Sequence, residues 1–145
     1  MLSASKVPPF NEAGYLPPGI HRASMAEIAS RFGGGEIRER WKSILREVMA
    51  LAKSTGSLEA AYIFGSFVTA KAAPADIDLF LVMSRDFSSN QVVGRTRLLF
   101  DYSRAAIVWG ICIYWITART DRIPFLETWQ LRRSGGQQGI VEVDL

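Results

Sequence analysis

The stretch AAYIFGSFVTAKAAPADIDLFLVM, residues 60–83, decides the fold because it holds two short apolar runs separated by a loop. Residues 60–64 and 77–83 are apolar apart from Asp78, and turn-forming residues bound each run. Short apolar runs of this kind predict strands that are buried on both faces of a sheet. A charge inside the second run needs a reason, so Asp78 is a candidate functional residue.

Elements on either side of this stretch predict an α/β (α+β) fold. A capping box at residues 24–27 predicts a short helix that ends at Phe32. Amphipathic spacing predicts a second helix over about 36–54, with Arg38 on its outer face. The remaining expected elements are helices over 88–102 and 124–131, a third buried strand over 106–117 and an edge strand over 139–145. This order favours one domain with a small mixed sheet flanked by helices.

The first 23 residues differ from the rest in being rich in proline and glycine. Such a segment disfavours a helix or a central strand, and its apolar side chains predict an arm packed on the domain. We therefore expect an arm over 1–23 and the domain over 24–145. Nothing in the arm has the form of a signal peptide, and no apolar stretch reaches the roughly 20 residues of a spanning helix. A cytoplasmic protein without membrane contact is the expectation.

The composition excludes several kinds of disulfide and metal site. The chain has 145 residues, a formal net charge of +3, one cysteine and one histidine. One cysteine excludes an intramolecular disulfide and a multi-cysteine zinc site, and one histidine excludes a His–His metal pair. The mildly basic charge is compatible with a nucleotide or RNA partner but does not require one.

The candidate site lies in the opening stretch. Asp76 and Asp78 are two residues apart, so on a strand both carboxylates point to the same face. Two adjacent carboxylates repel, and Mg²⁺, which takes one or two carboxylates together with substrate phosphates, relieves that repulsion. Gly65 permits close approach of a phosphate to the backbone, and Ser66 can donate to a phosphate oxygen. The alternative is that Asp76 only caps a helix or ends a loop and that Asp78 is an exposed strand residue.

This pattern, residues 64–66 followed by residues 76–79, resembles the signature of the DNA polymerase β-like nucleotidyltransferase superfamily. The segments over 9–21, 65–71 and 139–142 also resemble those of a family of small bacterial proteins within that superfamily. The resemblance implies that Asp76 and Asp78 bind one or two Mg²⁺ ions. It further implies that Gly65 and Ser66 hold the phosphates of a nucleoside triphosphate, and Lys71 lies close enough in sequence to reach them.

The implied reaction transfers a nucleotide to a hydroxyl of a protein, an RNA or a small molecule, with loss of pyrophosphate. The resemblance also implies a toxin–antitoxin or phage-defence setting, with an antitoxin as partner, and the small size with an apolar arm is compatible with a homodimer. A catalytically degenerate nucleotide- or partner-binding module of the same fold is the alternative.

One difference from the pattern of the superfamily favours the catalytically degenerate module. Active members of the superfamily commonly supply a third carboxylate from a neighbouring strand, but the strand expected over 106–117 contains no acid. Cys112 is expected where that acid would stand, and a thiol is a poor Mg²⁺ ligand. Asp101 and Asp121 are the nearby acids that remain as substitutes.

Other residues have two interpretations. A structural hydrogen bond is favoured over catalysis for His21, and Lys71 is as compatible with a solvated loop as with a phosphate contact. Trp109, Tyr114 and Trp115 are expected to be core residues rather than a base-stacking platform. Arginines of the second half suit phosphate or RNA, although a solvated face is the more common role: Arg95, Arg97, Arg104, Arg119, Arg122, Arg132 and Arg133.

Overall fold

The structure, a computed structural model, describes residues 7–145, and the expected arm is therefore described from residue 7 onward. The elements in chain order are β1 (Ile20–Ala23), α1 (Met25–Arg31), α2 (Glu36–Ser54), β2 (Leu58–Phe64), the 3-10 helix η1 (Gly65–Val68), β3 (Asp78–Met83), η2 (Ser89–Gln91), α3 (Gly94–Arg97), η3 (Leu98–Phe100), α4 (Tyr102–Trp109), β4 (Cys112–Thr117), α5 (Ile123–Trp129) and β5 (Ile140–Val143). Within the described range, no helix is both long and apolar enough to cross a membrane.

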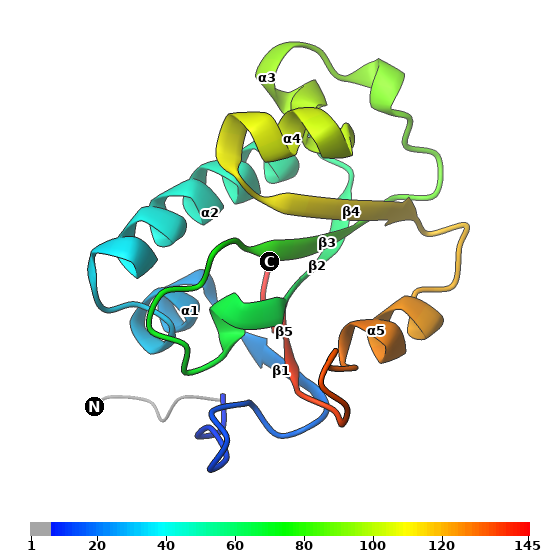
Figure 1. The fold of residues 1–145 in the computed structure, drawn as a ribbon. Helices are drawn as coiled ribbons and strands as arrows, with labels where there is room; N and C mark the ends of the chain where they lie inside the picture. Colours follow the sequence, from blue (N-terminus) through cyan, green and yellow to red (C-terminus); the bar gives the residue numbers. More distant parts are fainter. Residues whose placement is uncertain (1–6) are drawn as a thin grey trace, which may run out of the picture.

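The strands form one mixed sheet in the order β1-β5-β2-β3-β4 (Figure 1). The strands β2 and β3 are antiparallel neighbours, as are β2 and β5. The pairs β1–β5 and β3–β4 are parallel. The expected α/β (α+β) class with a small mixed sheet flanked by helices is therefore confirmed.

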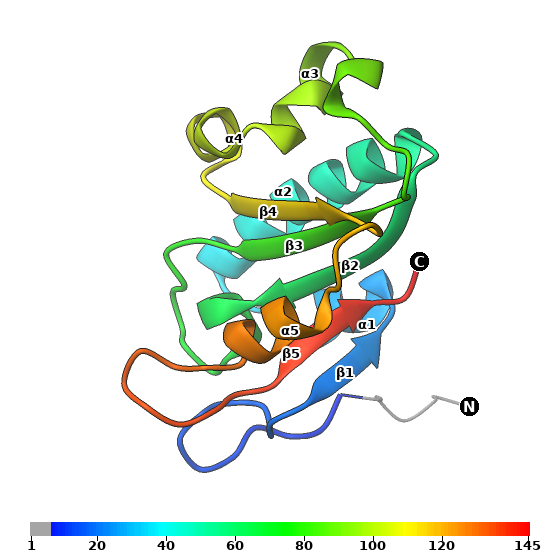
Figure 2. The ribbon, with the colours of Figure 1, turned by 90° about the vertical axis from the view of Figure 1, so that its right-hand side faces the viewer.

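Helices cover both faces of the sheet, with α1 and α2 on one face and α5 on the other (Figure 2). Alternate residues of β2 and β3 enter two separate cores, because successive side chains of a strand point to opposite faces. Ile63 and Leu79 pack with buried residues of α1 and α2, whereas Tyr62 and Phe80 pack with Leu126 of α5. The two central strands are consequently apolar on both sides, as their sequence predicted.

The first two helices follow the sequence closely. The Ser24 hydroxyl accepts a hydrogen bond from the Glu27 N–H at 3.1 Å, as the capping box predicted. The longer helix α2 has the bounds that the amphipathic pattern indicated.

The interpretation of residues 106–117 as one strand was wrong in its first half. Asp101 caps α4 by accepting from the Arg104 N–H, and Gly110 ends that helix in the left-handed conformation with φ of 70°. Only residues 112–117 form a strand. The apolar residues near 106–109 are compatible with either structure, and the two helix ends decide between them.

Two further expectations need correction. The single helix expected over 88–102 is instead three short turns, and Gly94 begins the second of them with φ of 64°. The strand expected at an edge, β5, lies inside the sheet between β1 and β2. The edge position is instead occupied by β1, which is formed by the last residues of the arm. The described part of the arm contains no helix and no central strand, which agrees with its composition.

Candidate functional site

The candidate site lies where three neighbouring strands meet at one end of the sheet. Phe64 is the last residue of β2 and faces Asp78, the first residue of β3, across the antiparallel pair. Cys112, the first residue of β4, faces Asp78 on its other side. The register of the sheet therefore places Asp78 between the glycine turn that follows β2 and the start of β4.

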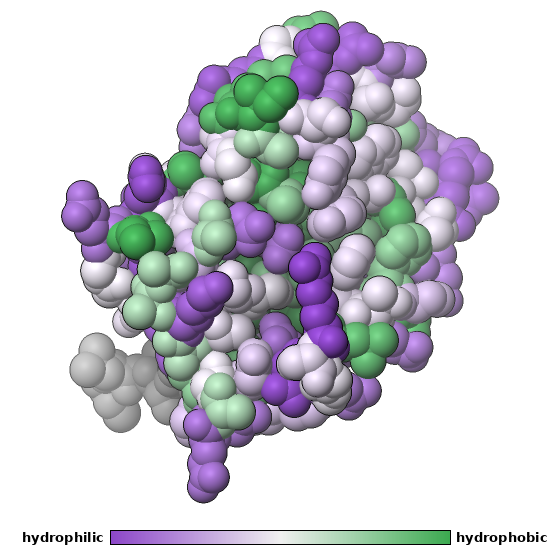
Figure 3. All heavy atoms as spheres, viewed as in Figure 1, coloured by the Kyte–Doolittle hydropathy of each residue, from purple (hydrophilic) through white to green (hydrophobic). Residues whose placement is uncertain are grey.

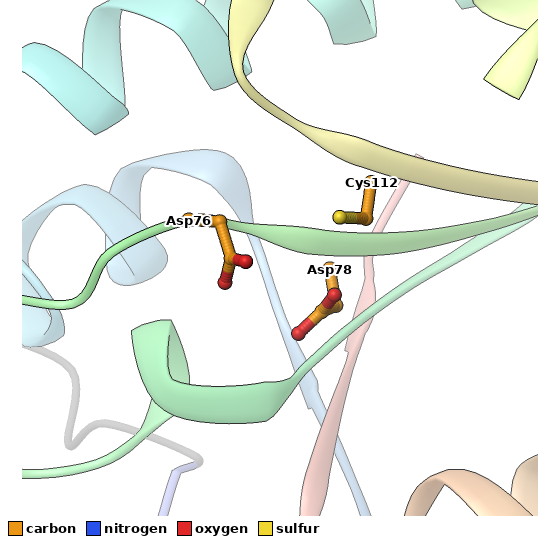
Figure 4. Close-up of side chains that lie close together, drawn as sticks. All are labelled: Asp76, Asp78 and Cys112. Carbon is orange, nitrogen blue, oxygen red and sulfur yellow. The ribbon is translucent and has the colours of Figure 1, made fainter. Parts of the chain in front are cut away.

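Asp76, Asp78 and Cys112 come together as a cluster (Figure 4). One carboxylate oxygen from each aspartate and the Cys112 Sγ all lie within 4.8 Å of one another. Both carboxylates point into the space beside η1, and the thiol lies above them at the start of β4. The structure thus brings together the two acids that sequence singled out and the cysteine expected in place of a third.

A tight contact positions Asp78 against the turn. Gly65 has φ of 79°, which favours glycine, and a Cβ at this position would overlap the Asp78 Oδ2 atom. Glycine is therefore required at position 65 both by backbone conformation and by the space that the carboxylate occupies. The Asp78 carboxylate therefore packs directly against the Gly65–Ser66 turn.

The environment of Asp78 disfavours its charged form. Burial and the neighbouring charge of Asp76 raise the pKa of Asp78 to about 6, while a hydrogen bond from Cys112 and the charge of Arg133 act in the opposite direction. Burial raises the pKa of the Cys112 thiol as well, and the two carboxylates add to that effect against a hydrogen bond from Tyr102. The thiol is therefore protonated near neutral pH.

The donor set of this cluster fits a hard divalent cation through its two carboxylates. A cation bound between Asp76 and Asp78 would relieve the repulsion that raises the pKa of Asp78. The neutral thiol of Cys112 adds little to such a site, because sulfur suits softer metals. The residues therefore fit Mg²⁺ with two protein carboxylates and leave the third position without an anion.

A pocket of about 820 Å³ adjoins the cluster and includes Asp78 in its wall. Its walls come from the arm near Tyr15, from residues 64–71, from β4, from the end of α5 and from the chain between α5 and β5. Hydrophilic side chains border the hollow near the middle of the face shown in Figure 3, with hydrophobic surface between them. The residues expected to contact phosphate, Gly65, Ser66 and Lys71, all line it.

Arg38 holds the loop that carries Lys71, and this corrects its expected place on the outer face of α2. Only 6% of Arg38 is exposed. Its guanidinium donates to the carbonyls of Phe67, Thr69 and Lys71 at 2.8, 2.7 and 2.6 Å, and to Phe32 at 3.0 Å. The sequence pattern of α2 carries no sign of these partners, because all four are backbone carbonyls of other segments.

The pocket also contains residues for which sequence favoured another role. Tyr114 packs against the core, as expected, but it is only half-buried and also lines the pocket together with Trp129, whose ring centroid lies 4.8 Å away. Arg132 and Arg133 line it as well, although a solvated face was the favoured interpretation. Trp109, by contrast, is a core residue as expected.

The remaining candidates have local structural roles. His21 Nε2 lies 2.7 Å from the carbonyl oxygen of Pro17, so the favoured structural hydrogen bond is present. Asp101 caps α4, and Asp121 accepts from the Ile123 N–H. Neither belongs to the cluster of Asp76 and Asp78, so within residues 7–145 no third acid joins that cluster.

Fold and site together define a small α+β domain with a paired-carboxylate site at the end of a mixed sheet. Residues 8–144 match DUF6932, a family of unknown function, and the chain belongs to this family. Searches of curated proteins and of solved structures found no match.

Proposed function

We propose that this protein is a Mg²⁺-dependent nucleotidyltransferase of the DNA polymerase β-like type. It transfers a nucleotide from a nucleoside triphosphate to a hydroxyl of a protein, an RNA or a small molecule. The observation that carries the proposal is the juxtaposition of Asp76 and Asp78 with the Gly65–Ser66 turn, beside a pocket that Asp78, Gly65 and Ser66 line.

The residues have separate roles in this proposal. Asp76 and Asp78 hold one or two Mg²⁺ ions, while the Gly65–Ser66 turn and Lys71 hold the phosphates. Bound Mg²⁺ supplies charge neutralisation and polarises the phosphate that is attacked. The acceptor oxygen forms a bond to the α-phosphorus, the bond to the bridging oxygen of the β-phosphate breaks, and pyrophosphate leaves. The hydroxyl proton passes to a phosphate oxygen of the substrate, because the cluster offers no third carboxylate.

A second function is a binding module of the same fold that no longer transfers nucleotides. The specific observation in its favour is Cys112, which faces Asp78 in the strand register and has a raised pKa. A neutral thiol there removes the third anion that active enzymes of this type commonly use. In either form, we place the protein in the cytoplasm in a toxin–antitoxin or defence setting, with a homodimer or an antitoxin as the protein partner.

Calorimetric titration with Mg²⁺ and each nucleoside triphosphate tests the shared part of both proposals. We expect Mg²⁺-dependent nucleotide binding that is lost when Asp76→Asn and Asp78→Asn are combined. Binding that does not depend on Mg²⁺, or that survives both substitutions, contradicts the metal site. Incubation with labelled nucleotide and cell lysate then separates the two functions, since only the transferase yields a labelled product.

A further inference from the structure

Three cationic side chains line the pocket that includes Asp78 in its wall, and each comes from a loop. Lys71 follows η1, and Arg132 and Arg133 lie between α5 and β5. In the part of the chain that the structure describes, none of the three forms an ion pair with a carboxylate. Other arginines of the second half are paired, for example Arg95 with Glu47 at 2.6 Å and Arg119 with Asp86 at 2.9 Å. The pocket therefore concentrates unpaired positive charge.

Two buried N–H groups in the same wall also have no acceptor. The Nε atom of Arg132 and the Nε1 atom of Trp129 are buried without a hydrogen-bond partner among the described residues. Buried donors are nearly always satisfied in native proteins, and an exception calls for an explanation such as a missing ligand. Cations and unpartnered donors on residues of one wall together favour a ligand with several acceptor oxygens.

The loops that carry these cations are fastened to one another through the arm. Tyr15 forms a β-bridge with Thr69, and its ring lies under the Arg132 guanidinium with 4.3 Å between Cζ and the ring centroid. Gln138, in the same loop as Arg132 and Arg133, donates to the carbonyl of Gly65 at 3.4 Å. The two loops that carry the cations are consequently fastened to each other and to the glycine turn that contacts Asp78, and the Arg132 guanidinium is held against Tyr15.

We propose that Lys71, Arg132 and Arg133 form an anion subsite that takes a polyphosphate chain, with Tyr15 positioning Arg132. The identity of the ligand as a nucleoside triphosphate rests on the proposed function, whereas the subsite itself rests on the unpaired cations and donors. Arginine suits this role because its planar fork donates two parallel hydrogen bonds to phosphate oxygens. Three cations beside a Mg²⁺-loaded carboxylate pair match the several negative charges of a triphosphate better than those of a monophosphate.

Inorganic tripolyphosphate is the probe that tests the subsite without the metal. Calorimetric titration in Mg²⁺-free buffer at about 0.1 M ionic strength, where charges more than about 10 Å apart are largely screened, should show binding to the wild type. We expect Arg132→Gln and Arg133→Gln each to weaken that binding about tenfold, the loss of one charge-assisted contact. Arg132→Lys keeps the charge but lacks the planar guanidinium that donates two parallel hydrogen bonds. Its affinity for tripolyphosphate should therefore lie between those of the wild type and Arg132→Gln.

Arg40→Gln is the matched control, because Arg40 is exposed on α2 and does not line this pocket. It removes the same charge and should leave tripolyphosphate affinity within about twofold, since exposed charges at a distance are screened. Absence of binding to the wild type, or equal weakening by Arg40→Gln and the pocket variants, overturns the subsite. Circular dichroism of each variant checks that the fold is kept.

The combined Asp76→Asn and Asp78→Asn variant separates this proposal from the proposed function. Without metal it should bind tripolyphosphate at least as tightly as the wild type, because two repelling charges are gone. Tripolyphosphate binding that requires Arg132 and Arg133, together with no Mg²⁺-dependent nucleotide binding, would retain the subsite and refute the transferase. Mg²⁺-dependent nucleotide binding that does not change when either arginine is replaced would support the metal site of the proposed function and refute the anion subsite.

Discussion

The Oδ2 atom of Asp78 occupies the position that a Cβ at residue 65 would need. Gly65 follows β2 and Asp78 begins β3, so this contact joins the two strands at the point where the candidate metal and phosphate sites meet. The glycine is thus required by the position of a carboxylate as well as by its own φ of 79°.

Gly65→Ala should therefore reduce stability and ligand binding together. We expect a loss of about 1 kcal/mol from the left-handed conformation and about 1–3 kcal/mol more from displacement of Asp78. Gly56→Ala is the matched control, because Gly56 has φ of 70° but open space around its Cβ position. Urea unfolding of both variants measures the difference. Equal losses would contradict a specific contact with Asp78.

The pH dependence of stability should show the unfavourable charge of Asp78. Its pKa is about 6 in the folded protein against 3.8 for an unperturbed group, so the folded state holds the proton more tightly. The unfolding free energy of the metal-free protein should then fall as pH rises from about 4 to about 6 and stay lower above that range. Asp78→Asn removes this contribution and should be more stable than the wild type at pH 7 but not at pH 4.

Thermal unfolding of the wild type and Asp78→Asn across pH 4–8, without metal, measures this difference. Mg²⁺ at pH 7.5 should raise the midpoint of the wild type and leave that of Asp78→Asn nearly unchanged, because only the wild type has both carboxylates. A difference between the two proteins that does not vary with pH would show that Asp78 titrates normally.

Arg38→Met should loosen the loop that carries Lys71. The substitution leaves the carbonyls of Phe67, Thr69 and Lys71 without their buried donor, with an expected loss of about 3 kcal/mol or more. Arg40→Met, on the exposed side of the same helix, should change stability by less than about 0.5 kcal/mol. Hydrogen exchange of residues 66–71 should accelerate in Arg38→Met alone. Unchanged exchange there would refute the role of Arg38 in holding this loop.

Replacement of Cys112 tests whether it occupies the place of a missing acid. Cys112→Asp puts a third carboxylate beside Asp78, so the metal-free protein should be less stable and Mg²⁺ should bind about tenfold more tightly. Cys112→Ser has a similar size without a charge and should bind Mg²⁺ as the wild type does. Calorimetry with Mg²⁺ compares the three proteins, and equal affinities would show that position 112 does not reach the ion.

Sequence by itself determined the elements with a strong local signal. The capping box at Ser24 and the amphipathic period of α2 set the first two helices, because neighbours along the chain make these interactions. The apolar runs around β2 and β3 identified the two central strands, and the charge within the second run indicated Asp78. Local patterns suffice wherever the interacting groups lie a few residues apart.

Only the tertiary structure decided which distant residues share the site. The parallel register of β3 and β4 sets Cys112 beside Asp78, and packing of the arm brings Tyr15 under Arg132. Arg38 has its partners on loops about thirty residues away, so its helical pattern is that of an exposed arginine. The strand β5 became central because β1 pairs with its free edge. These contacts join segments with large sequence separation, and their energy depends on a geometry that exists only once the sheet has formed.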